Sequence, residues 1–167
     1  KIEAYASDIY WEEDPKKMGE SASRVKSFGY RTIKAHLGCD SPKEETQRVH
    51  ALREAIGPNI NLMIDLNGGY DALQVMEAAK LWEPFNLYWL EEPVASFQIE
   101  RLASLKNKIS TPIAAGENEF RLHGFKNLFD KNAVDIAMPD IGRVGGIQET
   151  RNICALAHSY GILVSPH

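Results

Sequence analysis

The sequence predicts an α/β fold: an incomplete (β/α) barrel of the TIM type, with about seven strands and six helices. Short apolar runs alternate with amphipathic segments along the chain, as successive parallel strands and helices would. Six runs close on a polar residue, 23 to 31 residues apart: Lys34, Asp65, Glu91, Glu117, Asp140 and His167. One strand, one helix and two loops have about this length, and active sites of such barrels lie at the carboxyl ends of the strands.

The first elements are a strand, a helix and a second strand. The run from Ile2 to Ser7 is the first predicted strand. Asp14 followed by Pro15 is typical of a helix start, and Gly29 is typical of a helix end. The second predicted strand runs from Tyr30 to Lys34.

The next segment predicts two helices around a third strand. Residues 41–44 form a Ser-Pro-Lys-Glu capping box, which opens a helix that ends near Ile56. The third strand is expected from Asn59 to Asp65. Asp71 caps the following helix, which stops before Pro84 because proline cannot continue it.

The rest of the chain continues the alternation. The predicted strands are Leu87 to Glu91, Pro112 to Gly116, Ala133 to Met138 and Ile162 to Pro166. The predicted helices are Ile99 to Lys106, Arg121 to Asp130, and a last one from Gly145-Gly146 to Gly161. These strands are apolar on both faces, as buried parallel strands are. A doubly wound sheet usually gathers its site at one switch point, so polar residues after nearly every strand favour a barrel.

A closed barrel of this type needs about 250 residues and eight strands. We therefore interpret residues 1–167 as a partial barrel, a catalytic domain whose last unit is absent from this chain.

Composition narrows the class of protein. The chain is 44% apolar and 25% charged with a net charge of −4, which argues against nucleic-acid and anionic-membrane partners. No apolar run approaches the roughly 20 residues of a membrane span, and the first residues do not resemble a signal peptide. Cys39 and Cys154 lie far apart in sequence, which favours free thiols in a reducing compartment. We expect a cytoplasmic enzyme.

Three carboxylates end three consecutive predicted strands: Asp65, Glu91 and Glu117. Neighbouring strands lie about 4.8 Å apart, so these groups would repel one another unless a cation joined them. Ligands that are all oxygen favour Mg²⁺. The alternative is that each is an ordinary solvated loop start or helix cap.

Asp140 and His167 end the next two strands. A carboxylate beside an imidazole fixes its tautomer and raises its basicity, which produces a general acid or base near neutral pH. Lys34 and His36 lie on the opposite side of the predicted rim and project to one side of their strand. This pair could bind a carboxylate and move a proton, or Lys34 could simply neutralise the acidic cluster.

Six motifs resemble the barrel domain of the enolase superfamily, in its mandelate racemase/muconate lactonizing enzyme family. They are GYRTIKAHLG, IDLNGGY, LEEP, AAGEN, MPDIGRVGG and VSPH. The resemblance implies Mg²⁺ bound by Asp65, Glu91 (the first glutamate of LEEP) and Glu117. It also implies that a base removes the α-proton of a carboxylate substrate to give an enediolate.

The same resemblance assigns the remaining site residues. Asp140 and His167 would form the His–Asp dyad of the mandelate racemase-like subgroup, and Asn67 matches a position that contacts substrate. The family usually has Lys-x-Lys on the second strand, whereas this chain has Lys34 and His36. The substitution argues against a symmetric two-base racemase and leaves the main proton transfer to His167.

The expected activity is dehydration of a sugar acid, an aldonate or aldarate, to a 2-keto-3-deoxy acid. The alternatives are a racemase or epimerase of a 2-hydroxy acid and a non-catalytic barrel that only binds metal. A further alternative takes residues 142–146, GRVGG, as a phosphate-binding loop. The resemblance also implies an N-terminal capping domain that is absent from this chain, and we expect a homo-oligomer.

Overall fold

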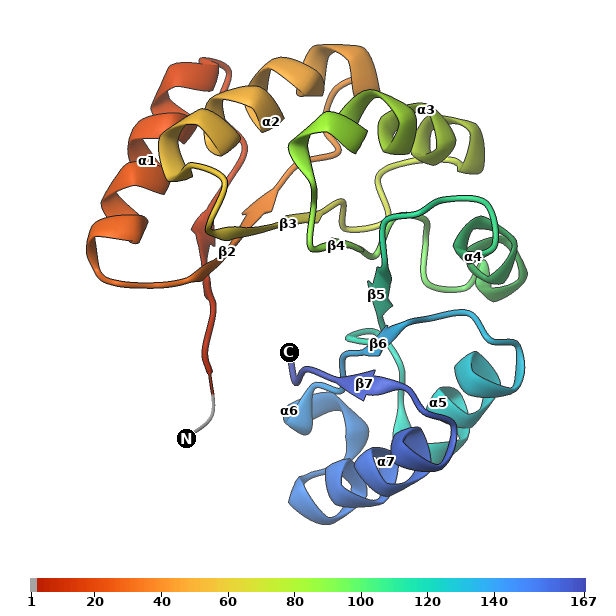
Figure 1. Ribbon diagram of the computed structural model, residues 1–167. Coiled ribbons are helices and arrows are strands. Elements are labelled where there is room, and N and C mark those ends of the chain that lie inside the picture. The colour runs from red at the N-terminus through yellow and green to blue at the C-terminus, as the bar shows by residue number, and fades with distance from the viewer. Residues whose placement is uncertain (1–2) are drawn as a thin grey trace.

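The computed structural model describes residues 3–167, and its centre is a curved parallel sheet (Figure 1). The strands of this described part are β1 (Ala6–Ile9), β2 (Thr32–His36), β3 (Asn61–Asp65), β4 (Trp89–Glu91), β5 (Ile113–Ala115), β6 (Ile136–Ala137) and β7 (Leu163–Val164). They pair in sequence order, and every pair is parallel. The order contains no reversal, so the sheet has no switch point of the doubly wound kind.

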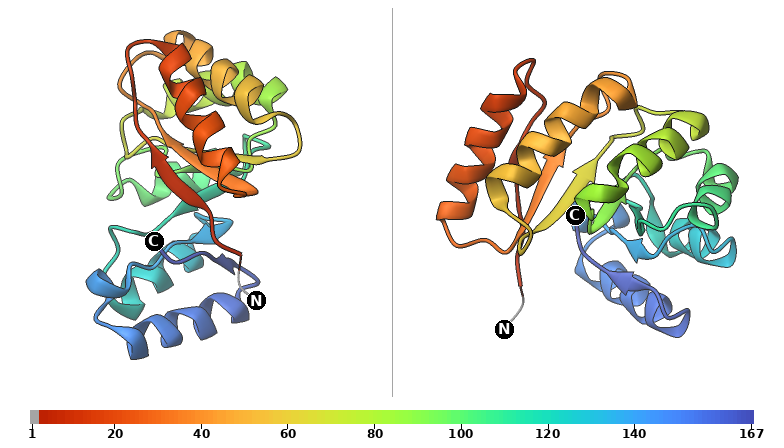
Figure 2. Two further views of the ribbon diagram at one scale, coloured as in Figure 1. Left: turned by 90° about the vertical axis from the view of Figure 1, so that its left-hand side faces the viewer. Right: turned by 45° about the horizontal axis from the view of Figure 1, so that its top comes forward.

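Helices connect the strands and lie outside the curve of the sheet (Figures 1 and 2). They are α1 (Pro15–Ser27), α2 (Pro42–Ile56), α3 (Ala72–Trp82), the 3₁₀ turn η1 (Glu83–Phe85), α4 (Ile99–Lys106), α5 (Arg121–Asp130), α6 (Ile141–Val144) and α7 (Ile147–Ser159). The expected α/β barrel architecture is therefore confirmed. No helix in residues 3–167 combines the length and apolarity that crossing a membrane requires.

Local capping signals place the first three helices where the sequence predicts them. The Asp14 side chain accepts a hydrogen bond from the backbone N–H of Lys16 at the start of α1. Reciprocal capping boxes open α2 at Ser41 and α3 at Asp71. Such contacts need only neighbouring residues, which is why they can be recognised in the sequence.

Two apolar clusters lie on the two sides of the sheet. The larger one packs the sheet against the helices and includes Ile33, Ile64 and Phe125. The smaller one consists of Met63, Trp89, Ala114, Ile136 and Met138, with Tyr5 packed against it. A parallel sheet that is apolar on both faces and carries helices on one is what a barrel wall requires.

The last five strands are shorter than predicted and lie within the predicted ranges, whereas the first two strands are shifted along the chain. The first strand is Ala6–Ile9 rather than Ile2 to Ser7, and Ile2 lies outside the described residues. The second continues to His36, so Lys34 lies in its middle and not at its end. The reason is pairing: five consecutive residues of β2 are matched with β3, up to His36 opposite Asp65.

The helix count also differs. The described residues contain seven α-helices rather than six, because the four-residue α6 precedes α7. Gly145 ends α6 with φ of 109°, and Gly146 precedes α7 with φ of 96°. The GRVGG segment is thus the end of one helix and the turn into the next. Cys39 and Cys154 are both free thiols, as expected.

Candidate active site

Strand pairing brings three predicted site residues to one level. His36 of β2 is the register partner of Asp65 of β3, and Asp65 is the register partner of Glu91 of β4. Each of these residues is the last of its strand. The carboxyl ends of neighbouring parallel strands lie at the same edge of a sheet. The three side chains therefore lie side by side at that edge.

Lys34 joins the two buried carboxylates. Its Nζ atom lies 3.3 Å from Asp65 Oδ2 and donates a hydrogen bond to Glu91 Oε1. All three side chains are at most 2% exposed. Burial acts to lower the pKa of Lys34, but the charge of Glu91 and the hydrogen bond to it, together with Asp65, raise it overall. Lys34 is therefore held as a cation between the carboxylates, which fits the neutralising alternative.

Two aromatic residues that the sequence did not single out surround this group. Trp89 Nε1 donates a 3.0 Å hydrogen bond to Glu91 Oε2. The Tyr5 ring faces Lys34 Nζ at 5.7 Å and packs edge-on against Trp89. The spacing of Trp89 and Glu91 was the only feature of the sequence that could have indicated this contact. Residues two apart on a strand project to the same side of the sheet.

A second group forms where the ends of β4, β5 and β7 meet. Ligand atoms of Glu91, Glu117 and His167 all lie within 4.8 Å of one another. Glu117 Oε2 lies 3.0 Å from His167 Nε2. This buried oxygen nevertheless has no hydrogen-bond partner among the described residues.

The two carboxylates of this second group, Glu91 and Glu117, fit a hard divalent cation. Burial and the neighbouring charge of Asp65 raise the pKa of Glu91, so a further positive charge would stabilise the ionised form. Glu117 Oε2 accepts no hydrogen bond from the described residues and can therefore serve as a ligand, and carboxylate oxygens are what Mg²⁺ prefers. Asp65 is outside the 4.8 Å group. Its Oδ2 atom is shared by Lys34 and His36, each at 3.3 Å.

Asp140 and His167 are neighbours, as the sequence predicted. His167 Nδ1 lies 3.6 Å from Asp140 Oδ2, an ion-pair distance longer than a normal hydrogen bond. Asp140 also accepts backbone hydrogen bonds from Gly142 at 2.7 Å and Arg143 at 3.3 Å, because it caps α6. The bond from Gly142 is the main cause that lowers the pKa of Asp140. Asp140 is thus held ionised beside the imidazole.

Both ring nitrogens of His36 and one face of its ring have neighbours, and the side chain is 20% exposed. Its Nε2 atom lies 3.2 Å from Ser7 Oγ. Its Nδ1 atom lies 3.3 Å from both Asp65 Oδ2 and Asn67 Nδ2. The ring of Tyr10 stacks on it at 4.8 Å with an interplanar angle of 7°. Ser7 and Tyr10 come from β1 and the loop that follows, and no pattern in the sequence linked them to His36.

Glu92 lies next to the site but points elsewhere. It has φ of 40°, which turns the chain sharply after β4. Its Oε1 atom accepts a 2.8 Å hydrogen bond from the N–H of Gly116, directly before Glu117. Burial raises its pKa to about 7; the bond from Gly116 opposes the shift, and the charge of Glu117 adds to it. The second glutamate of LEEP therefore ties the end of β4 to the end of β5.

With this geometry, the comparisons with known proteins identify the family. Residues 17–167 match the family described as enolase C-terminal domain-like, so the chain belongs to that family. It is 31% identical over 99% of its length to a 3,6-anhydro-alpha-L-galactonate cycloisomerase of Streptomyces coelicolor. It is 38% identical over 83% of its length to an L-talarate/galactarate dehydratase of Salmonella typhimurium, of which it covers 35%. The chain spans about half the length of the curated relatives it matches, 46% of the Streptomyces protein.

Solved structures show the same fold. The 3,6-anhydro-D-galactonate cycloisomerase of Zobellia galactanivorans superposes with a TM-score of 0.94 at 37% identity, covering 99% of this chain and 46% of that one. The L-talarate dehydratase of Polaromonas, complexed with Mg and L-glucarate, gives a TM-score of 0.94 at 31% identity, covering 99% and 47%. The resemblance seen in the motifs is therefore confirmed.

Proposed function

We propose that the protein is a Mg²⁺-dependent dehydratase that converts an aldonate or aldarate into a 2-keto-3-deoxy acid. The observation that carries this proposal is the approach of Glu91, Glu117 and His167 to within 4.8 Å of one another at the strand ends. Relatives named as dehydratases of arabinonate, xylonate, gluconate and galactonate support the substrate class.

The metal ligands in this proposal are Asp65, Glu91 and Glu117. Bound there, Mg²⁺ would supply positive charge beside the substrate carboxylate, where negative charge develops when the α-proton leaves. Lys34 Nζ lies between Asp65 and Glu91 and supplies positive charge to both ligands. Asn67 and Lys34 are the proposed substrate contacts on this side.

His167 is the proposed base. Asp140 faces Nδ1, and Nε2 is directed at the metal group, 3.0 Å from Glu117 Oε2. We propose that this nitrogen takes the α-proton once Glu117 is bound to the metal. The electron pair of the broken C–H bond stays on the substrate. In dehydration the bond from the β-carbon to its hydroxyl oxygen then breaks, and the leaving oxygen takes a proton from His167 to depart as water. The remaining enol rearranges to the 2-keto-3-deoxy acid.

The surroundings of His36 favour dehydration over racemisation. A two-base racemase needs an available nitrogen on each face of the substrate. Both nitrogens of His36 are already engaged, by Ser7 at 3.2 Å and by Asp65 at 3.3 Å. A racemase or epimerase is the second candidate, because a racemase of Streptomyces coelicolor with bound magnesium superposes with a TM-score of 0.95 at 31% identity.

One assay separates the candidates. The full-length protein is incubated with Mg²⁺ and a panel of aldonates and aldarates in deuterium oxide, and products are followed by NMR. Dehydration yields a 2-keto-3-deoxy acid, whereas racemisation yields deuterium at Cα without loss of water. Neither product with any acid would favour a non-catalytic barrel. His167→Asn should abolish turnover, and His158→Asn, at an exposed position of α7, is the matched control.

We also propose that the full-length protein acts on small carboxylates as a cytoplasmic homo-oligomer, without nucleic-acid or membrane partners. The net charge of −4 and the two free thiols support this setting. Light scattering of the purified protein measures the number of subunits directly.

A further inference from the structure

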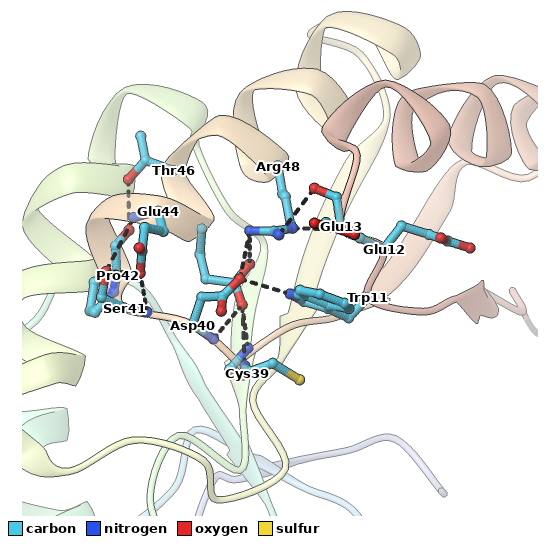
Figure 3. A network of polar contacts seen from close by, with 12 residues as sticks. Trp11, Glu12, Glu13, Cys39, Asp40, Ser41, Pro42, Glu44, Thr46 and Arg48 are labelled. Atoms are coloured by element: carbon cyan, nitrogen blue, oxygen red, sulfur yellow. Dashed lines mark hydrogen bonds and ion pairs between the residues drawn. The ribbon is translucent and has the colours of Figure 1, made fainter.

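A buried arginine ties together the loops that follow β1 and β2 (Figure 3). Arg48 of α2 donates to the backbone carbonyl of Glu12 at 2.7 Å and to that of Glu13 at 3.3 Å. Its Nη1 atom lies 3.0 Å from Asp40 Oδ2 in the other loop. The guanidinium also stacks on the Trp11 ring at 4.7 Å. Both loops leave the carboxyl ends of their strands, on the side of the candidate active site.

Glu45 holds the second of these loops from within. Its Oε1 atom accepts hydrogen bonds from the backbone N–H groups of Gly38, Cys39 and Asp40 at 3.1 to 3.2 Å. Its Oε2 atom lies 3.4 Å from Arg48 Nη1, and the side chain is fully buried. Both residues of the Glu45–Arg48 ion pair therefore form hydrogen bonds with loop backbone. We call Trp11, Asp40, Glu45 and Arg48 the loop clamp.

One residue of the loop clamp, Trp11, is adjacent in sequence to a residue that contacts His36. Tyr10 precedes Trp11, and its ring lies flat on the imidazole of His36 at 4.8 Å. Tyr10 is 63% exposed, so packing in the core does not fix its position. Trp11 is fixed on both sides, by the stack on Arg48 and by a 3.3 Å hydrogen bond to Asp40.

We propose that Arg48 is a positioning residue for His36: it holds the loop after β1 so that Tyr10 stacks on the imidazole. The ring then keeps the orientation in which Nδ1 faces Asp65 and Nε2 faces Ser7. This inference rests on the proposed function for any effect on catalysis, but the position of the ring can be measured without it.

The same helix offers a matched control. Arg53, also on α2, donates to four backbone carbonyls, those of Phe85, Gly57, Ile60 and Asn86, at 2.7 to 3.1 Å. These carbonyls belong to η1 and to the loops that precede β3 and β4, at the opposite end of the strands. Arg53→Met therefore removes a comparable set of contacts without touching the loop clamp.

The experiment uses full-length protein labelled with ¹³C-histidine, and the His36 signal is assigned by its loss in His36→Gln. A stacked tyrosine shifts that signal through its ring current. Arg48→Met and Tyr10→Leu should both change the chemical shift of His36 in the direction opposite to the ring-current shift, because both variants remove the stacked tyrosine. Tyr10→Phe keeps the ring and should keep the signal in place, and Arg53→Met should leave it unchanged.

Kinetics supply the second readout. With a sugar acid that the protein dehydrates, kcat/KM should fall about tenfold in Arg48→Met and not in Arg53→Met, because small displacements of a reacting group slow the chemical step. If Arg48→Met does not fold, Arg48→Lys tests the same point, since lysine keeps the charge beside Glu45 but lacks the planar fork.

The outcomes distinguish failure of the positioning role from failure of the proposed function. An unmoved His36 signal in the Arg48 variant, or an equal movement in Arg53→Met, overturns the positioning role whatever the activity. A signal that moves as expected in a protein that dehydrates no acid supports the positioning role and counts against the proposed function.

Discussion

His167 Nε2 lies 3.0 Å from Glu117 Oε2, so the proposed base directly borders a proposed metal ligand. Asp140 lies on the other side of the same imidazole, 3.6 Å from Nδ1. The ring therefore has one nitrogen toward an orienting carboxylate and the other toward the metal group. This arrangement links proton transfer and metal binding through a single side chain.

Glu117→Gln should weaken Mg²⁺ binding by about 100-fold, because it removes a charged ligand from a buried group. Isothermal titration of the full-length protein with Mg²⁺ measures the affinity. Glu100→Gln, an exposed change on α4 that removes an ion pair with Lys131, is the control and should bind Mg²⁺ as the unmodified protein does. Equal affinity in Glu117→Gln would remove Glu117 from the ligand set.

Asp140→Asn should lower kcat by about 100-fold or more with little change in KM, because the amide no longer holds the tautomer of His167. Steady-state kinetics with the best sugar acid test this expectation. Asp130→Asn, at the exposed end of α5, provides the comparison. A change confined to KM would show that Asp140 binds substrate rather than orienting the base.

Lys34→Met should lower the free energy of unfolding by about 3 kcal/mol in EDTA, because Asp65 and Glu91 then remain buried without a cation. Added Mg²⁺ should restore part of this loss, since it returns positive charge to the same carboxylates. Urea unfolding with and without Mg²⁺ measures both effects. Lys126→Met breaks an exposed ion pair with Asp130 and should cost much less stability than Lys34→Met, because solvent screens exposed pairs. Loss of stability in Lys34→Met that Mg²⁺ does not reduce at all would contradict the account.

Glu92 makes stability depend on pH. Burial raises its pKa from 4.5 to about 7 in the folded protein, so the folded state binds the proton more tightly than the unfolded state. Its contribution to stability is therefore fully present below about pH 4.5 and is lost as pH rises through 7.

The variant Glu92→Gln removes this dependence. Between pH 5 and 8 the unmodified protein should lose stability relative to the variant, by on the order of 3 kcal/mol. Urea unfolding in EDTA at several pH values measures the difference. Parallel curves for the two proteins would mean that Glu92 titrates normally.

Local signals in the sequence predicted much of this fold. Asp14, Ser41 and Asp71 cap helices through contacts with residues two or three positions away, and such contacts are visible in a linear sequence. The short α6 was missed because four residues are too few to show helical periodicity.

The site was predictable only in part. Acidic residues at strand ends could be recognised because the carboxyl ends of parallel strands share one edge. The apolar run ends at Lys34, whereas β2 continues to His36 because its neighbour β3 pairs with it that far. The stack of Tyr10 on His36 joins segments that only the folded sheet brings together, so no spacing could indicate it.

We propose that Asp65, Glu91 and Glu117 bind one divalent cation beside His167. A crystal structure of the full-length protein with Mn²⁺ in place of Mg²⁺ tests this directly, because the anomalous signal locates the ion. We expect a single anomalous peak that all three carboxylates contact, next to His167 Nε2. A peak elsewhere, or one that these carboxylates do not contact, would contradict this proposal.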